Sequence, residues 1–155
     1  MPQPGTAAPD FEGATAPDET LRLSDLRGRW VALYFYPKDD TPGCTKQACN
    51  LRDHTSALTD AGVAVVGVSP DELASHDRFA AKYDLPFPLV ADPDRTIQEA
   101  YGVYGEKSFY GKTVIGVKRT TFLIDPDGVV RHVFKRPKTA EHAEEILARL
   151  ERLAA

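Results

Sequence analysis

A buried-strand pattern runs directly into a helical pattern in residues 30–53, and this junction limits the folds open to the chain. The residues from Trp30 to Tyr36 are apolar throughout, which is typical of a strand covered on both faces of a sheet. Pro37 ends the run, a polar turn follows, and a helical pattern opens at Cys44. A strand of this kind followed at once by a helix predicts an α/β protein with a central sheet.

Strand and helix patterns alternate along the rest of the chain. Short alternating stretches around Phe11 and Leu21 predict a small N-terminal hairpin. The alternation ends in two strands joined by a turn at residues 125–128, and then a helix from Thr139. This order predicts a mixed central sheet flanked by helices, as in thioredoxin-like folds. The expected elements are a helix at 45–61, a strand at 63–68, a helix at 69–83, a strand at 86–91, a short helix ended by Gly102, and strands at 120–124 and 129–134.

Two stretches carry more specific expectations. Residues 69–72 read Ser-Pro-Asp-Glu, which combines a capping box with proline at the first helical position and predicts a helix start at Ser69. Residues 102–118 show no clear pattern, so we expect a long connecting loop there, and such loops are usually functional or mobile.

The composition excludes several classes of protein. A chain of 155 residues, of which 42% are hydrophobic and 27% charged, fits a single globular domain over residues 1–155. The formal charge of −4 argues against binding to nucleic acid or to a membrane surface. No apolar run approaches the roughly 20 residues of a membrane span, and no signal peptide is visible at the N-terminus. We therefore expect a cytoplasmic protein, and we expect no metal or cofactor.

Both cysteines of the chain, Cys44 and Cys49, lie at the start of the helical pattern. The unpaired N–H groups and the positive dipole end of a helix start favour a thiolate at Cys44. Five helical residues would place the two Cα atoms about 8.7 Å apart on different faces. A disulfide needs Cα atoms within about 7 Å, so the two can bond only if a turn of the helix unwinds. A reactive thiol with a second thiol nearby suits formation of a sulfenic acid that is then resolved as a disulfide.

A reactive thiolate alone does not give a fast reaction. Lowering the pKa of a thiol raises the thiolate fraction but lowers its nucleophilicity, and the two effects nearly cancel. The rate must therefore come from donors that stabilise the leaving oxygen. The candidates are the Thr41 hydroxyl, the backbone N–H groups of Gly43 and Cys44, and the guanidinium of Arg119. Pro37 would stiffen the pocket and limit water, and this arrangement suits a peroxide.

Each of these residues also has a plainer reading. Cys44 could be an inert buried thiol, Cys49 a packed helix residue, and Thr41 only a residue of the helix entry. Cys44, Cys49 and His54 could be metal ligands, although their spacing scatters them around a helix. From its residue type alone, Arg119 would be a surface ion-pair partner. The four histidines receive no role beyond solvated or capping positions, and Asp39 and Asp40 are interpreted as turn residues.

The stretch from Phe35 to Cys49, FYPKDDTPGCTKQAC, resembles the active-site signature of the peroxiredoxin Q family, the bacterioferritin comigratory proteins. It contains the Pro-x-x-x-Thr-x-x-Cys motif of peroxiredoxins as Pro37, Thr41 and Cys44. Further matches are Ser69-Pro70-Asp71, Leu85-Pro86-Phe87-Pro88-Leu89, Gly105-Glu106-Lys107-Ser108 and Arg119-Thr120-Thr121-Phe122-Leu123-Ile124-Asp125.

The resemblance implies a thioredoxin-like fold and the reduction of hydrogen peroxide and alkyl hydroperoxides. It implies that Cys44 is the peroxidatic cysteine, Cys49 the resolving cysteine, and Arg119 the arginine of the active site. It also implies that thioredoxin or a similar dithiol protein reduces the disulfide, and that the enzyme is a monomer. Two alternatives stay open: a peroxide sensor using the same disulfide, and a general thiol–disulfide oxidoreductase, against which the missing Cys-x-x-Cys motif counts.

Overall fold

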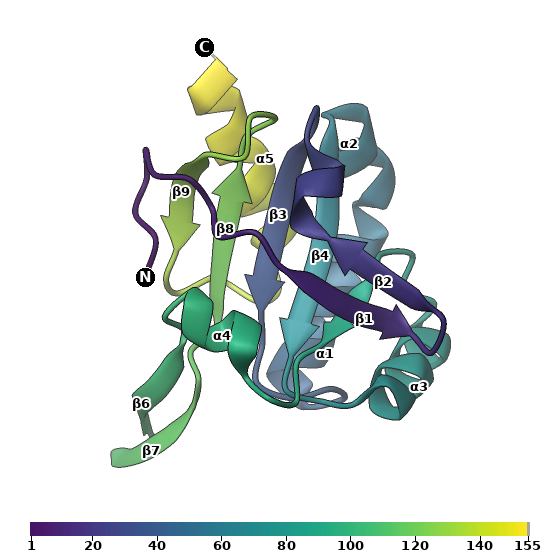
Figure 1. Cartoon of the computed structure of the whole chain (residues 1–155), viewed down its shortest axis with the longest axis vertical. Helices are drawn as coiled ribbons and strands as arrows, with labels where there is room; N and C mark the ends of the chain where they lie inside the picture. Colours follow the sequence, from purple (N-terminus) through teal and green to yellow (C-terminus); the bar gives the residue numbers. More distant parts are fainter. Residues whose placement is uncertain (155) are drawn as a thin grey trace.

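The computed structural model describes residues 1–154 and has a seven-stranded mixed sheet at its centre (Figure 1). The strand order is β2-β1-β5-β4-β3-β8-β9. The pairs β3–β4 and β4–β5 are parallel, and the remaining pairs are antiparallel. The strands of this sheet are β1 (Glu12–Ala16), β2 (Glu19–Arg22), β3 (Trp30–Phe35), β4 (Val63–Ser69), β5 (Leu89–Ala91), β8 (Thr120–Ile124) and β9 (Val130–Phe134). The expected mixed sheet with its N-terminal hairpin is confirmed.

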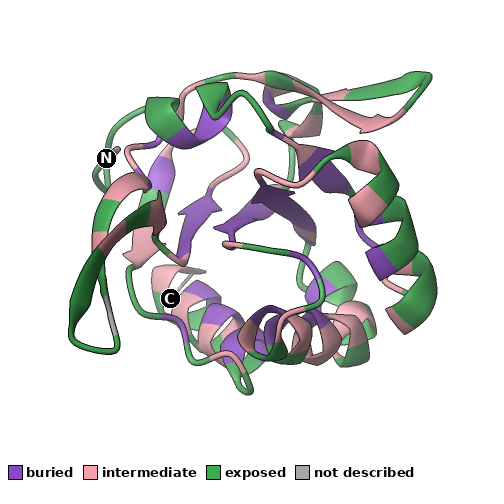
Figure 2. Ribbon diagram, turned by 90° about the horizontal axis from the view of Figure 1, so that it is seen from below, coloured by how far each residue is buried: buried purple, intermediate pink, exposed green. Residues whose placement is uncertain are grey.

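Helices cover both faces of the sheet, so the molecule has two hydrophobic cores. Alternate residues of β3 face opposite ways: Ala32 and Tyr34 belong to one core, and Leu33 and Phe35 to the other. The first core receives residues of α1 (Pro42–Asp53), α2 (Thr55–Asp60), α3 (Leu73–Tyr83) and α5 (His142–Ala154). The second receives residues of the 3-10 helix η1 (Leu23–Leu26) and of α4 (Thr96–Ala100). Buried residues accordingly lie on the central strands and on the helix sides that face them (Figure 2). None of the described helices is both long and apolar enough to cross a membrane.

The single helix expected at 45–61 is wrong in two respects. Helix α1 already begins at Pro42, and the helical path breaks at His54, where α2 follows. Side chains near the break bond to backbone carbonyls four residues back: His54 Nδ1 lies 2.8 Å from the Asn50 oxygen, and the Thr55 hydroxyl donates to Leu51. Such bonds compete with the helical pattern and favour a break.

The long loop expected at 102–118 is also wrong. It is a hairpin of β6 (Tyr104–Phe109) and β7 (Lys112–Val117), which projects from the body of the molecule below α4 (Figure 1). Its two-residue turn, Tyr110 and Gly111, has positive φ at both positions, as tight hairpin turns require. The sequence signal was weak because tyrosine rarely adopts this conformation.

Two predicted helix starts lie too early in the chain. Helix α3 begins at Leu73 rather than at Ser69, because the Ser69 hydroxyl and the Asp71 carboxylate bond to each other instead of capping the helix. The final helix α5 begins at His142 rather than at Thr139.

Candidate active site

The first turn of α1 places Cys44 at the edge of the first core. Thr41 has extended backbone angles at the position before the helix, and its carbonyl accepts the first helical hydrogen bond from the Thr45 N–H at 2.8 Å. Pro42 begins the helix, where its missing N–H and fixed φ are tolerated. Cys44 is the third helical residue and is 1% exposed. Cys44 therefore belongs to the first turn, whose N–H groups have no partners within the helix.

The pairing of β3 with β8 brings Arg119 to Cys44. Phe35 pairs with Thr120, so Arg119, one residue earlier in the chain, lies where β3 ends and the path to α1 begins. Its Nη2 donates a hydrogen bond of 3.3 Å to the Cys44 sulfur, and its Nη1 donates one of 2.7 Å to Gln47 Oε1. A Cβ at Gly43 would lie only 3.1 Å from Nη2, so glycine leaves room for the guanidinium. The positive charge and the donated hydrogen bond both stabilise a thiolate at Cys44.

Thr41 and Pro37 lie on the loop between β3 and α1, at residues 36–41. The Thr41 hydroxyl donates to the Lys38 carbonyl at 2.9 Å, so its proton is already engaged and its oxygen can accept a hydrogen bond. Pro37 is half-buried and lies two residues after the end of β3. Of the five predicted site residues, the structure brings Cys44 and Arg119 into direct contact. Thr41 and Pro37 lie on the loop that leads from β3 into α1.

Cys49, the fifth predicted residue, is held away from Cys44 by the helix. Both cysteines are free thiols and lie within the continuous helix α1, with Cys44 buried and Cys49 half-buried. The geometric expectation that an intact helix keeps them unbonded is met by this structure. A bond between them requires residues 44–49 to leave the helical conformation.

The charge of Cys44 also acts on two residues that had no predicted role, Tyr34 and Lys107. Tyr34 is buried, and burial followed by the charge of Cys44 raises the pKa of its phenol well above the usual value, so the phenol stays protonated. Lys107 of β6 donates to the Val117 carbonyl at 2.7 Å, and partial burial together with the charge of Arg119 lowers the pKa of its ammonium group. Lys107 of the β6–β7 hairpin is therefore within electrostatic range of Arg119 and Cys44.

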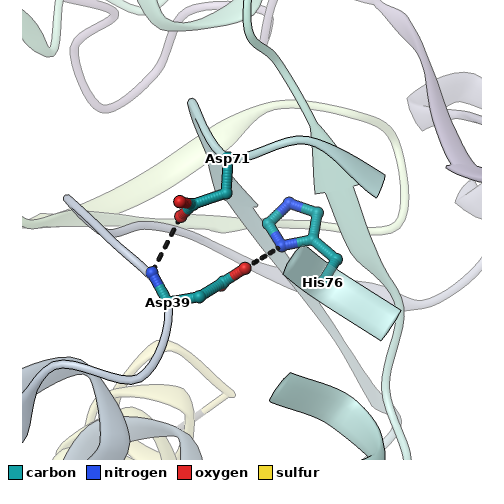
Figure 3. A group of neighbouring side chains, drawn as sticks. All are labelled: Asp39, Asp71 and His76. Atoms are coloured by element: carbon teal, nitrogen blue, oxygen red, sulfur yellow. Dashed lines mark hydrogen bonds and ion pairs between the residues drawn. The ribbon is translucent and has the colours of Figure 1, made fainter. Parts of the chain in front are cut away.

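A buried polar network holds the loop that leads into α1. The Asp39 carboxylate contacts His76 Nδ1 at 2.7 Å, and the Asp39 N–H donates to Asp71 Oδ2 at 2.8 Å (Figure 3). Asp39 and Asp40 lie in a turn, as expected, but the Asp39 side chain is only 3% exposed and is bonded across the fold. The expectation of solvated or capping histidines is wrong for His76 and His142, which are 3% and 0% exposed. Nothing in the local sequence pattern marks such long-range partners.

Comparison with known proteins gives a consistent assignment. Residues 4–133 match the AhpC/TSA family. The chain is 50% identical over 146 residues to a protein of Coxiella burnetii named putative peroxiredoxin bcp, covering 94% of this chain and 97% of that protein. It is 48% identical over 143 residues to peroxiredoxin Bcp of Escherichia coli K12, covering 92% of each.

Solved structures agree with the sequence comparisons. A mutant of PrxQ from Xylella fastidiosa superimposes with a TM-score of 0.92 at 34% identity, covering 100% of this chain and 99% of that one. The bacterioferritin comigratory protein of Xanthomonas campestris, whose structures address its alkyl peroxide reduction activity, gives a TM-score of 0.86 at 38% identity, with coverage of 94% and 92%. The chain belongs to the AhpC/TSA family, as a peroxiredoxin of the Bcp, or peroxiredoxin Q, type.

Proposed function

We propose that this peroxiredoxin reduces hydrogen peroxide and alkyl hydroperoxides with Cys44 as the peroxidatic and Cys49 as the resolving cysteine. The observation that carries the assignment of Cys44 is the Arg119 Nη2 contact to its sulfur. Of the two cysteines, Cys44 has this cationic donor and lies in the first turn of α1. A nucleophilic thiolate needs both features, whereas an inert buried thiol needs neither.

In the first step, the Cys44 thiolate attacks one oxygen of the peroxide and the O–O bond breaks. The attacked oxygen stays on sulfur as a sulfenic acid, and the other leaves as water or an alcohol after taking up a proton. Arg119 and the N–H groups of Gly43 and Cys44 would stabilise the negative charge on the departing oxygen. The Thr41 hydroxyl donates its proton to the backbone carbonyl of Lys38, so its oxygen would accept a hydrogen bond from the peroxide. Pro37 would limit the access of water.

In the second step, the Cys49 thiolate attacks the Cys44 sulfur, an S–S bond forms, and the sulfenic oxygen leaves as water. This step needs a local unwinding of α1 between the two cysteines. A dithiol protein of the thioredoxin type would then reduce the disulfide by thiol–disulfide exchange and restore the helix. Because both cysteines lie on one helix of one chain, a monomer suffices, and we propose that the enzyme acts as a monomer in the cytoplasm, where such reductants operate.

The test is a single turnover of the reduced protein. One equivalent of hydrogen peroxide is mixed with the protein, Trp30 fluorescence is followed by stopped flow, and the product is mapped by mass spectrometry. We expect fast oxidation and an intramolecular Cys44–Cys49 disulfide. Oxidation as slow as that of a free thiol would contradict the peroxidase assignment, and fast oxidation without turnover by thioredoxin would favour the sensor.

A further inference from the structure

The loop at residues 36–41 is anchored through Asp39. This loop carries Pro37 and Thr41 and leads into the first turn of α1, so its conformation sets where the proposed peroxide pocket lies relative to Cys44. Asp39 stands two residues before Thr41 and five before Cys44, and its side chain points toward His76 of α3 (Figure 3).

Three donors converge on the Asp39 carboxylate. The Tyr36 hydroxyl donates to Oδ1 at 2.6 Å, and the Ser75 hydroxyl donates to Oδ2 at 2.8 Å. His76 Nδ1 lies 2.7 Å from the same Oδ2. Burial, with the nearby Tyr34 and Asp39, raises the pKa of Tyr36 well above its usual value, so its phenol stays a donor. The carboxylate is therefore satisfied by groups from the end of β3 and from α3.

The hydrogen bonds of His76 define where one proton resides. Its Nε2 lies 3.0 Å from the Val90 carbonyl, which can only accept, so Nε2 carries a proton. Its Nδ1 faces the Asp39 carboxylate, so a second proton lies between the ring and Asp39. The side chains of His76 and Asp39 are each 3% exposed, and they form a buried pair that holds this proton. Breaking such a pair leaves a buried polar group without its partner, which is costly.

The backbone of the loop is tied at the same place. The Asp39 N–H donates to Asp71 Oδ2 at 2.8 Å, and the Ser69 hydroxyl donates to that oxygen at 2.7 Å. Asp39, Asp71 and His76 are residue types that also bind metals, and their ligand atoms lie within 4.8 Å of one another. Hydrogen bonds already join these groups into one network, so their arrangement is that of an anchor between the loop, the end of β4 and α3.

We propose that Asp39 and His76 are a positioning pair, which fixes the 36–41 loop on α3 so that Thr41 and the first turn of α1 bind the peroxide in the reactive geometry. This rests on the proposed peroxidase function. Neither residue touches the reacting atoms; the pair acts through the loop. A displacement of about 1 Å in a reactive geometry can lower a rate by about 100-fold, so the loss of a buried anchor has a measurable effect.

The neighbouring residue Asp40 supplies a matched control. It also bonds to α3, through Lys82 Nζ and the Tyr83 hydroxyl, each at 2.8 Å, but this ion pair is exposed at 57% for Lys82 and 44% for Asp40. Exposed pairs of this kind contribute little. Asp40 has a positive φ of 55°, which asparagine adopts readily, so Asp40→Asn preserves the backbone.

The experiment compares two reactions of Cys44 in the same proteins. Both reactions are followed in a Cys49→Ser background, where Cys44 is the one remaining thiol. Oxidation by hydrogen peroxide, followed by stopped flow, needs the peroxide-binding geometry, whereas alkylation by iodoacetamide needs the Cys44 thiolate but not that geometry. We expect Asp39→Asn to lower the rate constant for oxidation by peroxide about 10- to 100-fold and to change the rate constant for alkylation by less than about threefold. In Asp40→Asn, both rate constants should stay within about twofold of those of the unmodified protein. Ser75→Ala removes one of the three donors and should give a smaller loss in the same direction; it also serves if Asp39→Asn does not fold.

Coupling between the two residues is tested by a double-mutant cycle. If Asp39 and His76 act as a pair, Asp39→Asn combined with His76→Leu should be no slower with peroxide than the slower single variant. The proposal is overturned if folded Asp39→Asn reacts with peroxide at the unmodified rate, if both reactions slow equally, or if the two losses multiply. A slow peroxide reaction in the unmodified protein would instead overturn the proposed function, so the two failures are distinguishable.

Discussion

The guanidinium of Arg119 and the sulfur of Cys44 are joined by a 3.3 Å hydrogen bond although 75 residues separate them in the chain. The contact depends on the antiparallel pairing of β3 with β8 and on the absence of a side chain at Gly43. The same guanidinium also bonds to Gln47, so one planar group joins the first turn of α1 to the next. This fixed fork is a property of arginine that lysine lacks.

Arg119→Lys should therefore lower the rate of Cys44 oxidation by hydrogen peroxide by about 100-fold, because one ammonium cannot make both bonds and the donor to the departing oxygen is lost. Stopped-flow fluorescence of Trp30 measures this rate. The matched control is Arg22→Lys, at an arginine whose ion pair with Glu12 is exposed, with the two side chains 53% and 49% exposed. Equal rates in the Arg119 variant and the unmodified protein would remove Arg119 from the mechanism.

Replacement of Cys44 and replacement of Cys49 should affect different steps of peroxide reduction. Cys44→Ser should abolish peroxide reduction, since a serine hydroxyl is not ionised at neutral pH. Cys49→Ser should leave the first oxidation intact but stop thioredoxin-supported turnover, because no second thiol can resolve the sulfenic acid. Single-turnover and steady-state assays separate these steps, and normal cycling of the Cys49 variant would show that another thiol resolves Cys44.

Oxidation should loosen α1. An intact helix keeps the two sulfurs apart, so the disulfide form must lose helical hydrogen bonds between residues 44 and 49. Hydrogen exchange measured by mass spectrometry should rise in peptides covering this segment after one equivalent of peroxide, and should stay unchanged in β4. Cys49→Ser treated in the same way is the control and should show no such rise. Unchanged protection of α1 in the disulfide form would exclude the unwinding.

Tyr34→Phe should stabilise the protein. The Tyr34 hydroxyl is buried and has no hydrogen-bond partner within the described residues, which costs free energy that phenylalanine avoids. We expect a gain of about 1 kcal/mol in the free energy of unfolding, or a rise in Tm of about 2–4 °C. Tyr36→Phe is the contrast, since the Tyr36 hydroxyl donates to Asp39 and its loss should destabilise the fold. A lower Tm for Tyr34→Phe would mean that its hydroxyl is satisfied in solution.

The buried His142 should make the protein sensitive to acid. Burial lowers the pKa of its imidazole below the usual 6.5, although the hydrogen bond to Glu145 opposes this. The unfolded chain therefore takes up a proton at a pH where the folded protein resists it, so stability is lost as the pH falls below about 6.5 towards the lower value of the folded state. Denaturant unfolding between pH 7.5 and 5 should show a smaller loss in His142→Gln than in the unmodified protein. An equal loss of unfolding free energy in the variant and the unmodified protein would contradict a role for His142 in acid sensitivity.

Much of the molecule is determined locally and could be predicted from the sequence. The apolar run at Trp30–Tyr36, the proline that ends it and the helix that follows are set by side-chain periodicity and by the backbone limits of proline, which act within a few residues. The peroxiredoxin signature lies in the same continuous stretch, so Pro37, Thr41, Cys44 and Cys49 could be predicted as site residues from the sequence. The conclusion that Cys44 and Cys49 cannot form a disulfide within an intact helix also needed only helix geometry.

Only the tertiary structure decided which distant groups meet. Arg119 came from family resemblance rather than from its residue pattern, and the sheet register explains why it reaches Cys44. The buried contact of Asp39 with His76 joins residues 37 positions apart and has no local signature, so Asp39 resembled an ordinary turn residue. The physical reason is the same in both cases. Hydrogen bonds and burial depend on distance in space, and the packing of the sheet and helices sets that distance for residues far apart in the chain.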